Sequence, residues 1–182
     1  MKISRRSFLK GTLAGAILLL HRPASALIPE SSPLPDAALS LVNIHTGENL
    51  SVNWRDSTGN YFPGPLERIN HFFRCHFTQQ IHPMDIRVIE FLNFVQKSAG
   101  GNHKVEIISG YRSPEYNELL IREGRGAAKH SLHLQGKAID FRIPEVGLDR
   151  LRDVAMRLKL GGVGYYPKSG FIHIDSGEPR SW

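Results

Sequence analysis

The chain has 182 residues, a length that suits one ordinary domain and is too short for two of typical size. Its composition, with 41% hydrophobic and 22% charged residues, excludes an intrinsically disordered chain, and the single cysteine, Cys75, excludes a disulfide framework or a cysteine-rich zinc finger. The formal net charge of +6 invites a nucleic-acid-binding function, which the distribution of that charge argues against.

The first 26 residues have the features of an export signal. Residues 4–10 read SRRSFLK, a twin-arginine pattern, and an apolar run from Gly11 to Leu20 follows. This run is too short for a membrane-spanning helix, which needs about 20 residues, and the small residues ASA then form a cleavage site after Ala26. We expect export to the periplasm by the twin-arginine machinery without a stable membrane anchor; an uncleaved anchor or a short buried helix is the alternative.

The export signal accounts for most of the positive charge. It contains five of the 23 basic residues and no acidic residue, so residues 27–182 carry 18 basic and 17 acidic side chains, a net charge of +1. No basic stripe with interleaved aromatic residues stands out in that part of the chain. Nucleic acid is therefore not an expected partner.

After the signal, the sequence divides into a leader and one domain. Residues 27–37 are rich in proline and serine and are expected to form a flexible leader, followed by a single domain over residues 38–182. Apolar and polar residues alternate on both sides of Thr46 and Gly47. This alternation predicts a β-hairpin over residues 39–54.

Two helices are predicted next. One helical pattern of apolar residues runs from Pro65 to Phe73, and another begins after Pro83, with Asp85 as its N-cap. Cys75 is expected to be a half-buried helix residue without a chemical role.

The second half of the chain alternates short strands with helices. Strands are predicted over residues 103–108, 137–143, 162–166 and 171–175. Helices are predicted over residues 114–123, with Ser113 as N-cap, and over residues 148–160. This mixed order favours an α+β fold, a small and mostly antiparallel sheet flanked by helices.

A histidine and an aspartate with metal-ligand chemistry surround a glycine turn. On the predicted strand, Asp140 shares a face with Ala138, opposite the apolar residues that should face the core, so Asp140 is expected to face a polar cleft. Gly136 allows the chain to reverse and to bring His133 beside Asp140.

A second group of this kind lies on the last predicted strand, where His173 and Asp175 share one face. Two histidines and one carboxylate suit zinc with an open fourth position, as in catalytic zinc sites, although several other divalent ions accept the same ligands. Spacing alone does not pair His133 and Asp140 with His173, because any of the eight histidines after residue 26 is an alternative ligand.

These motifs together resemble a known enzyme group. The pattern SxHxxGxAxD at residues 131–140, the late His173 and the segment GYRS at 110–113 resemble zinc peptidases of the D-Ala-D-Ala carboxypeptidase and dipeptidase type, which have the hedgehog-like peptidase fold. Within that group the chain is most similar to the exported murein endopeptidase K (YcbK-like) branch. The likeness covers nearly the whole chain after the signal and includes the segments NIHTGE (43–48), NHFFR (70–74) and GGVGYYP (161–167).

The resemblance implies a site composition. It implies one zinc ion per chain, with the ligands His133, Asp140 and His173. It also implies that Arg112 holds the substrate or the developing oxyanion, a task that suits a permanently charged group able to form two parallel hydrogen bonds. Tyr111 and Ser131 are expected at the substrate site, where Ser131 orders its loop and is not a nucleophile.

One position departs from the pattern of the wider group. Many of its members carry an acidic general base three residues before the last histidine ligand, and here that position is Gly170. Asp175 is our candidate, either as the base or as a residue that orients the site. His130 is a weaker candidate for the base.

From this resemblance we expect a periplasmic zinc endopeptidase that hydrolyses peptide cross-links of peptidoglycan during cell-wall growth. The bond would be D-Ala–diaminopimelate, diaminopimelate–diaminopimelate, or both. Two alternatives are a D,D- or L,D-carboxypeptidase that trims stem peptides, and a metal-containing module that binds peptidoglycan without cleaving it. Gly170 is the one feature that favours the binding module.

Overall fold

The computed structural model describes residues 36–182, so the expected export signal and most of the expected leader lie outside the described residues. The strands are β1 (Ala38–Asn43), β2 (Asn49–Asn53), β3 (Lys104–Ser109), β4 (Ala138–Arg142), β5 (Gly162–Tyr166), β6 (Phe171–Asp175) and β7 (Arg180–Ser181). The helices are α1 (Pro63–Phe72), α2 (Ile86–Ala99), α3 (Pro114–Arg122) and α4 (Leu148–Leu158), together with the 3-10 turn η1 (Leu132–Gln135).

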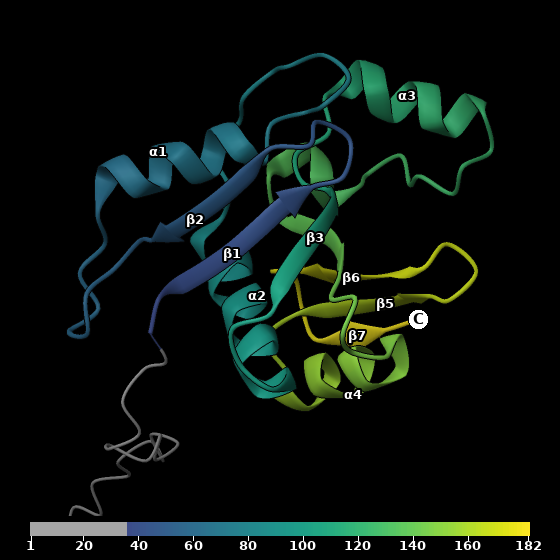
Figure 1. Cartoon of the computed structure of the whole chain (residues 1–182). Coiled ribbons are helices and arrows are strands. Elements are labelled where there is room, and N and C mark those ends of the chain that lie inside the picture. The colour runs from purple at the N-terminus through teal and green to yellow at the C-terminus, as the bar shows by residue number, and fades with distance from the viewer. Residues whose placement is uncertain (1–35) are drawn as a thin grey trace, which may run out of the picture. The chain divides into compact units, whose positions relative to one another are not determined.

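One sheet contains all seven of these strands, in the order β2-β1-β3-β4-β6-β5-β7 (Figure 1). The pairs β1–β3 and β5–β7 are parallel, and the other four pairs are antiparallel. The predicted α+β fold with a mostly antiparallel sheet is confirmed. Among the described residues, no helix combines the length and the apolar character that crossing a membrane requires.

The two predicted helix caps are confirmed. The Asp85 side chain accepts a hydrogen bond from Arg87 N at the start of α2, and the Ser113 side chain accepts one from Tyr116 N at the start of α3. A cap of this kind satisfies a backbone N–H that has no partner within its own helix. Asp85 also accepts a hydrogen bond of 2.8 Å from Ser176 Oγ, just after β6. A hydrogen bond therefore connects the start of α2 with the residue that follows β6, the strand that carries His173.

The core lies on one face of the central strands. Ile139 and Phe141 of β4 and Ile172 and Ile174 of β6 are fully buried on that face, in the same apolar cluster as side chains of α2 and α4. Period-two alternation places the neighbouring residues of each strand on the opposite face. That opposite face carries the polar residues singled out in the sequence.

The expectation that Cys75 is a half-buried residue of a helix is wrong. Cys75 lies beyond the end of α1 and is fully buried in a small cluster with Tyr111, Tyr116 and Leu120. The helical pattern of apolar residues cannot show this, because the chain turns after Phe73 and buries Cys75 through contacts with distant segments.

Candidate metal centre

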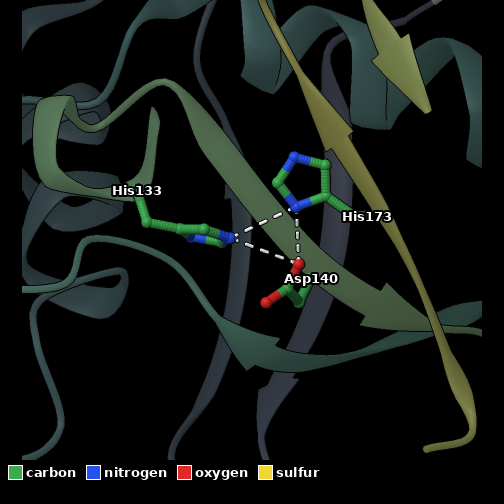
Figure 2. A group of neighbouring side chains, drawn as sticks. All are labelled: His133, Asp140 and His173. Carbon is green, nitrogen blue, oxygen red and sulfur yellow. Dashed lines mark hydrogen bonds and ion pairs between the residues drawn. The ribbon is translucent and has the colours of Figure 1, made fainter. Parts of the chain in front are cut away.

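His133, Asp140 and His173 converge on one point (Figure 2). Asp140 of β4 lies directly opposite His173 of β6 in the antiparallel register, and η1 brings His133 to the same place. His133 Nε2 lies 3.2 Å from His173 Nδ1 and 3.2 Å from Asp140 Oδ1, and His173 Nδ1 lies 2.8 Å from Asp140 Oδ1. All three residues are buried.

The turn that positions His133 depends on Ser131 and Gly136. Ser131 Oγ accepts a hydrogen bond of 3.3 Å from His133 N, which orders the start of η1. Gly136 ends η1 in the left-handed region, with φ of 64°, and a Cβ atom there would collide with the backbone oxygen of Pro83. Glycine is therefore required at residue 136 both for its dihedral angles and for the close approach of another segment.

Each of the three side chains forms a hydrogen bond through an atom that faces away from the point where the three meet. His133 Nδ1 donates to the backbone oxygen of Gly110 over 2.7 Å, and His173 Nε2 donates to Asp175 Oδ2 over 3.1 Å. Gly110 O can only accept, so His133 carries its proton on Nδ1. His173 lies between two carboxylates, and a proton on Nε2, towards Asp175, is the arrangement compatible with a metal ion at Nδ1. The remaining ring nitrogens, which face Asp140, are the ones available as ligands.

Asp140 is held in the same way. Its Oδ2 accepts a hydrogen bond of 2.5 Å from Arg112 Nη2, so its Oδ1 is left facing the two histidines. Arg112 Nε donates to Ser109 Oγ over 3.0 Å, which fixes the guanidinium plane. Hydrogen bonds behind metal ligands commonly orient them in this manner. The expected polar cleft is present on this side of β4, although Asp140 itself is only 2% exposed.

These three residues fit a divalent metal ion. Ligand atoms at the zinc–nitrogen and zinc–oxygen distances of tetrahedral sites lie about 3.3 Å from one another. The observed separations of 2.8 to 3.2 Å are close to that value. Two imidazole nitrogens and a carboxylate oxygen that converge in a buried place are a set of donor atoms that a divalent metal ion accepts.

The charges of the site follow from burial and from these contacts. Burial lowers the pKa of His133 to about 4, so this ring is neutral at pH 7. Burial alone would raise the pKa of Asp140, but its electrostatic interactions and hydrogen bonds with His133 and His173 hold that pKa well below its ordinary value. Burial opposes protonation of His173, yet its hydrogen bonds to Asp140 and Asp175 raise its pKa.

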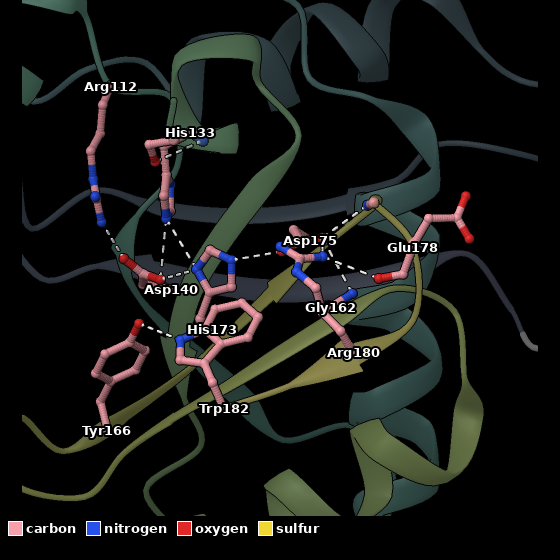
Figure 3. Close-up of polar contacts among 12 residues, drawn as sticks. Arg112, His133, Asp140, Gly162, Tyr166, His173, Asp175, Glu178, Arg180 and Trp182 are labelled. Carbon is pink, nitrogen blue, oxygen red and sulfur yellow. Dashed lines mark hydrogen bonds and ion pairs between the residues drawn. The ribbon is translucent and has the colours of Figure 1, made fainter. Parts of the chain in front are cut away.

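Asp175 lies on the far side of His173 from Asp140 (Figure 3). It is fully buried, and its carboxylate accepts further hydrogen bonds from the backbone N–H groups of Gly162 and Gly177 and from the Arg180 guanidinium. Although burial alone would raise its pKa, these hydrogen bonds and the one from His173 lower it. The His173 ring thus separates the Asp175 carboxylate from the point where the three ligand atoms meet.

A cavity of about 780 Å³ opens beside the three residues. Its wall includes Arg112, Ser131 and His130, which were predicted at the site. Tyr111, also expected there, does not belong to this wall; its ring stacks on His82 with 4.8 Å between ring centroids.

Gly170, where many members of the wider group carry an acidic general base, faces a basic residue. The nearest atom to a Cβ built on Gly170 is Arg142 Nη1, at 3.7 Å. The carboxylates in the cavity wall are those of Asp140 and Asp175, and both are engaged in hydrogen bonds. Among the residues that the structure describes, the wall of the cavity therefore has more basic than acidic groups.

The sequence reasoning missed the residues of the C-terminal strand β7 and its end. Arg180 donates to Asp175, and the Trp182 ring lies 5.3 Å from the His173 ring, centroid to centroid. The signal for them is indirect. Gly162 and Gly164 occupy alternate positions on the site-facing side of β5, and such glycines often mark a close approach of another segment.

Comparisons with known proteins agree with one another. The sequence family described as peptidoglycan L,D-endopeptidase MepK matches residues 33–182. The chain is 40% identical over 174 residues to peptidoglycan L,D-endopeptidase MepK of Escherichia coli (strain K12), covering 96% of this chain and 93% of that protein. It is 41% identical over 173 residues to probable peptidoglycan L,D-endopeptidase MepK of Haemophilus influenzae, covering 94% and 91% of the two chains. None of the solved structures matches.

Proposed function

Because the chain belongs to the peptidoglycan L,D-endopeptidase MepK family, we propose that it is a peptidoglycan endopeptidase that hydrolyses the peptide cross-links of the cell wall. The observation that carries this proposal is the converging set of His133, Asp140 and His173 at the wall of an open cavity, in a chain that matches the family over its whole described length. The names of the relatives do not favour the carboxypeptidase or the binding module.

The bond we propose is the diaminopimelate–diaminopimelate cross-link. An L,D-endopeptidase, as the relatives are named, cleaves between an L-centre and a D-centre. The diaminopimelate–diaminopimelate link joins the L-centre of one residue to the D-centre of the next, whereas the D-Ala–diaminopimelate link joins two D-centres. The name therefore favours the first of the two bonds expected from the sequence.

We propose that one zinc ion is held by His133 Nε2, Asp140 Oδ1 and His173 Nδ1. A bound zinc ion would lower the pKa of a water molecule and polarise the carbonyl group under attack. Arg112 donates to Asp140 and belongs to the wall of the cavity, where we propose that its remaining N–H groups bind a substrate oxygen. The placement of Asp175 behind His173 supports the orienting role among the two roles considered for it, and not that of the base.

The site of action we propose is the periplasm, reached through the twin-arginine machinery with cleavage after Ala26. The pattern SRRSFLK and the short apolar run support this route. Replacing Arg5 and Arg6 together by lysine should retain the protein in the cytoplasm, as cell fractionation would show. Replacement of Arg68 and Arg150, which lie outside the signal, should leave its location unchanged.

The experiment for the activity expresses the full chain, purifies the exported protein and digests cross-linked muropeptides, whose products are resolved by mass. We expect dimers to become monomers, and the reaction to stop with a chelator and with His133→Ala. His103→Ala, outside the cavity wall, is the matched control and should retain activity. Release of terminal D-Ala alone would replace the proposal by the carboxypeptidase. A folded, metal-loaded protein that forms no product would replace it by the binding module.

A further inference from the structure

The site-facing side of β5 carries Gly162, Gly164 and Tyr166. In the antiparallel register Gly164 lies opposite His173, and Tyr166 lies opposite Phe171. Paired residues of neighbouring strands project to the same face, so Tyr166 shares the face of His173. Tyr166 also belongs to the wall of the cavity.

Gly164 leaves room for an indole ring. A Cβ atom on Gly164 would lie 2.9 Å from the ring of Trp182 and 2.8 Å from the ring of Tyr166, closer than side chains normally approach. The backbone of Trp182 is held on β5 by two hydrogen bonds, from Trp182 N to Val163 O and from Tyr165 N to Trp182 O. Both the backbone and the ring of Trp182 therefore contact β5.

The hydrogen bond between the two aromatic side chains has only one possible direction. An indole N–H can donate but cannot accept, so Trp182 Nε1 donates to the hydroxyl oxygen of Tyr166, over 2.8 Å. The hydroxyl proton of Tyr166 is consequently free to point elsewhere. Within residues 36–182, this hydroxyl has no other hydrogen-bond partner.

Tyr166 belongs to the wall of the cavity, so its hydroxyl can donate to a group bound there. Figure 3 shows the Tyr166 hydroxyl on the side of His173 that lies away from Asp175, next to the indole nitrogen. Arg112 approaches Asp140 from another element, and two of its N–H groups are already engaged by Asp140 and Ser109. Tyr166 is thus a neutral donor in the wall of the same cavity as the cationic donor Arg112.

We propose that the Tyr166 hydroxyl donates a hydrogen bond to the oxygen of the peptide carbonyl that is cleaved, and that Trp182 is a positioning residue that orients this hydroxyl. The inference rests on the proposed endopeptidase function, because it names a further residue for the same reaction. A donor held in place before the substrate arrives needs no reorganisation as negative charge develops on that oxygen. The donation from the indole also polarises the hydroxyl and strengthens it as a donor.

The test is a double-mutant cycle on the purified, metal-loaded enzyme with cross-linked muropeptide dimers. Tyr166→Phe should lower kcat by about tenfold to a hundredfold and leave KM nearly unchanged, because the lost hydrogen bond is strongest in the transition state. Trp182→Phe should lower kcat less, since it keeps an aromatic ring and loses only the N–H. In the Tyr166→Phe background, Trp182→Phe should have almost no further effect, because it acts through the missing hydroxyl.

The matched control is Tyr165→Phe, on the other face of the same strand, where Arg152 lies over the ring. It should leave kcat unchanged. Full activity of Tyr166→Phe in an active enzyme would overturn the inference while leaving the endopeptidase function intact. Losses that multiply in the double variant would also overturn it, since the two residues would then act separately. An inactive wild-type enzyme that holds its metal would instead contradict the proposed function itself.

Discussion

Asp175 accepts a hydrogen bond from His173 at the ring nitrogen that faces away from Asp140. The distance from Asp175 Oδ2 to His173 Nε2 is 3.1 Å, whereas His173 Nδ1 lies 2.8 Å from Asp140 Oδ1. The two carboxylates therefore contact opposite nitrogens of one imidazole. Arg180 and two backbone N–H groups hold Asp175 from behind, so the orientation of His173 depends on the end of the chain as well as on β6.

This relationship predicts the behaviour of Asp175→Asn. The variant should bind zinc about tenfold to a hundredfold more weakly, because His173 loses the charge that orients it and makes it a stronger ligand. Saturating zinc should restore most of the activity. Zinc affinity is measured by competition with a chromogenic chelator, and Asp153→Asn, on α4, is the control. Unchanged zinc affinity with activity lost at saturating zinc would identify Asp175 as the base after all.

Replacement of Arg112 by lysine should lower the activity. Its guanidinium donates from Nη2 to Asp140 and from Nε to Ser109, and a single ammonium group cannot reproduce both contacts in one plane. We expect Arg112→Lys to lower kcat/KM by at least about tenfold, and Arg112→Ala by more, with muropeptide cleavage as the assay. Arg150→Lys on α4 serves as the control. Wild-type kinetics of Arg112→Lys would show that a simple positive charge is sufficient.

Gly136→Ala tests the turn that positions His133. Gly136 combines φ of 64° with a close approach to the Pro83 backbone, whereas Gly126 has φ of 72° and open space around it. Alanine at either position bears the cost of the left-handed conformation, about 1 kcal/mol, but only Gly136→Ala adds a backbone collision. Urea unfolding should therefore show a clearly larger loss for Gly136→Ala. Equal losses in the two variants would remove the role given to the Pro83 contact.

The contribution of Asp85 to the free energy of unfolding should depend on pH. Hydrogen bonds from Arg87 and Ser176 outweigh burial and lower the pKa of Asp85 to about 2, below the ordinary value of 3.8. A carboxyl with a depressed pKa stabilises the fold fully above its unfolded pKa and loses this effect as the pH falls through its folded pKa. Asp85→Ala should lower the free energy of unfolding by about 1 kcal/mol at pH 7.

The difference between wild type and Asp85→Ala should shrink as the pH falls from about 4 towards 2. Urea titrations at pH 7, 4 and 2.5 measure it. Asp149→Ala, in the first turn of α4, is a control without a hydrogen-bonded cap. A difference that stays constant across this range would mean that the contribution does not depend on the ionised carboxylate.

Most of the local structure follows from the sequence. The alternation in β1 and β2, the caps Asp85 and Ser113 and the limits of β5 and β6 are local signals, and the structure confirms them. The prediction for Cys75 was wrong because contacts with distant segments determine its burial. The role predicted for Tyr111 stays a prediction; its ring stacks on His82.

In the candidate site, too, some features follow from the local sequence and others only from tertiary contacts. Residue type, strand alternation and the turn at Gly136 mark two groups with ligand chemistry, His133 with Asp140 and His173 with Asp175, because these features depend on neighbours within a few positions. The choice of His133, Asp140 and His173 as one set came from the resemblance to a known family. That Asp140 and His173 meet was decided by the pairing of β4 with β6, which sets them opposite each other, and η1 adds His133. The orientation of each of these side chains, and the hydrogen bond from the Trp182 indole to the Tyr166 hydroxyl, depend on contacts between elements that are remote in sequence. Only the tertiary structure specifies such contacts, because no local pattern encodes which remote segment will supply the partner.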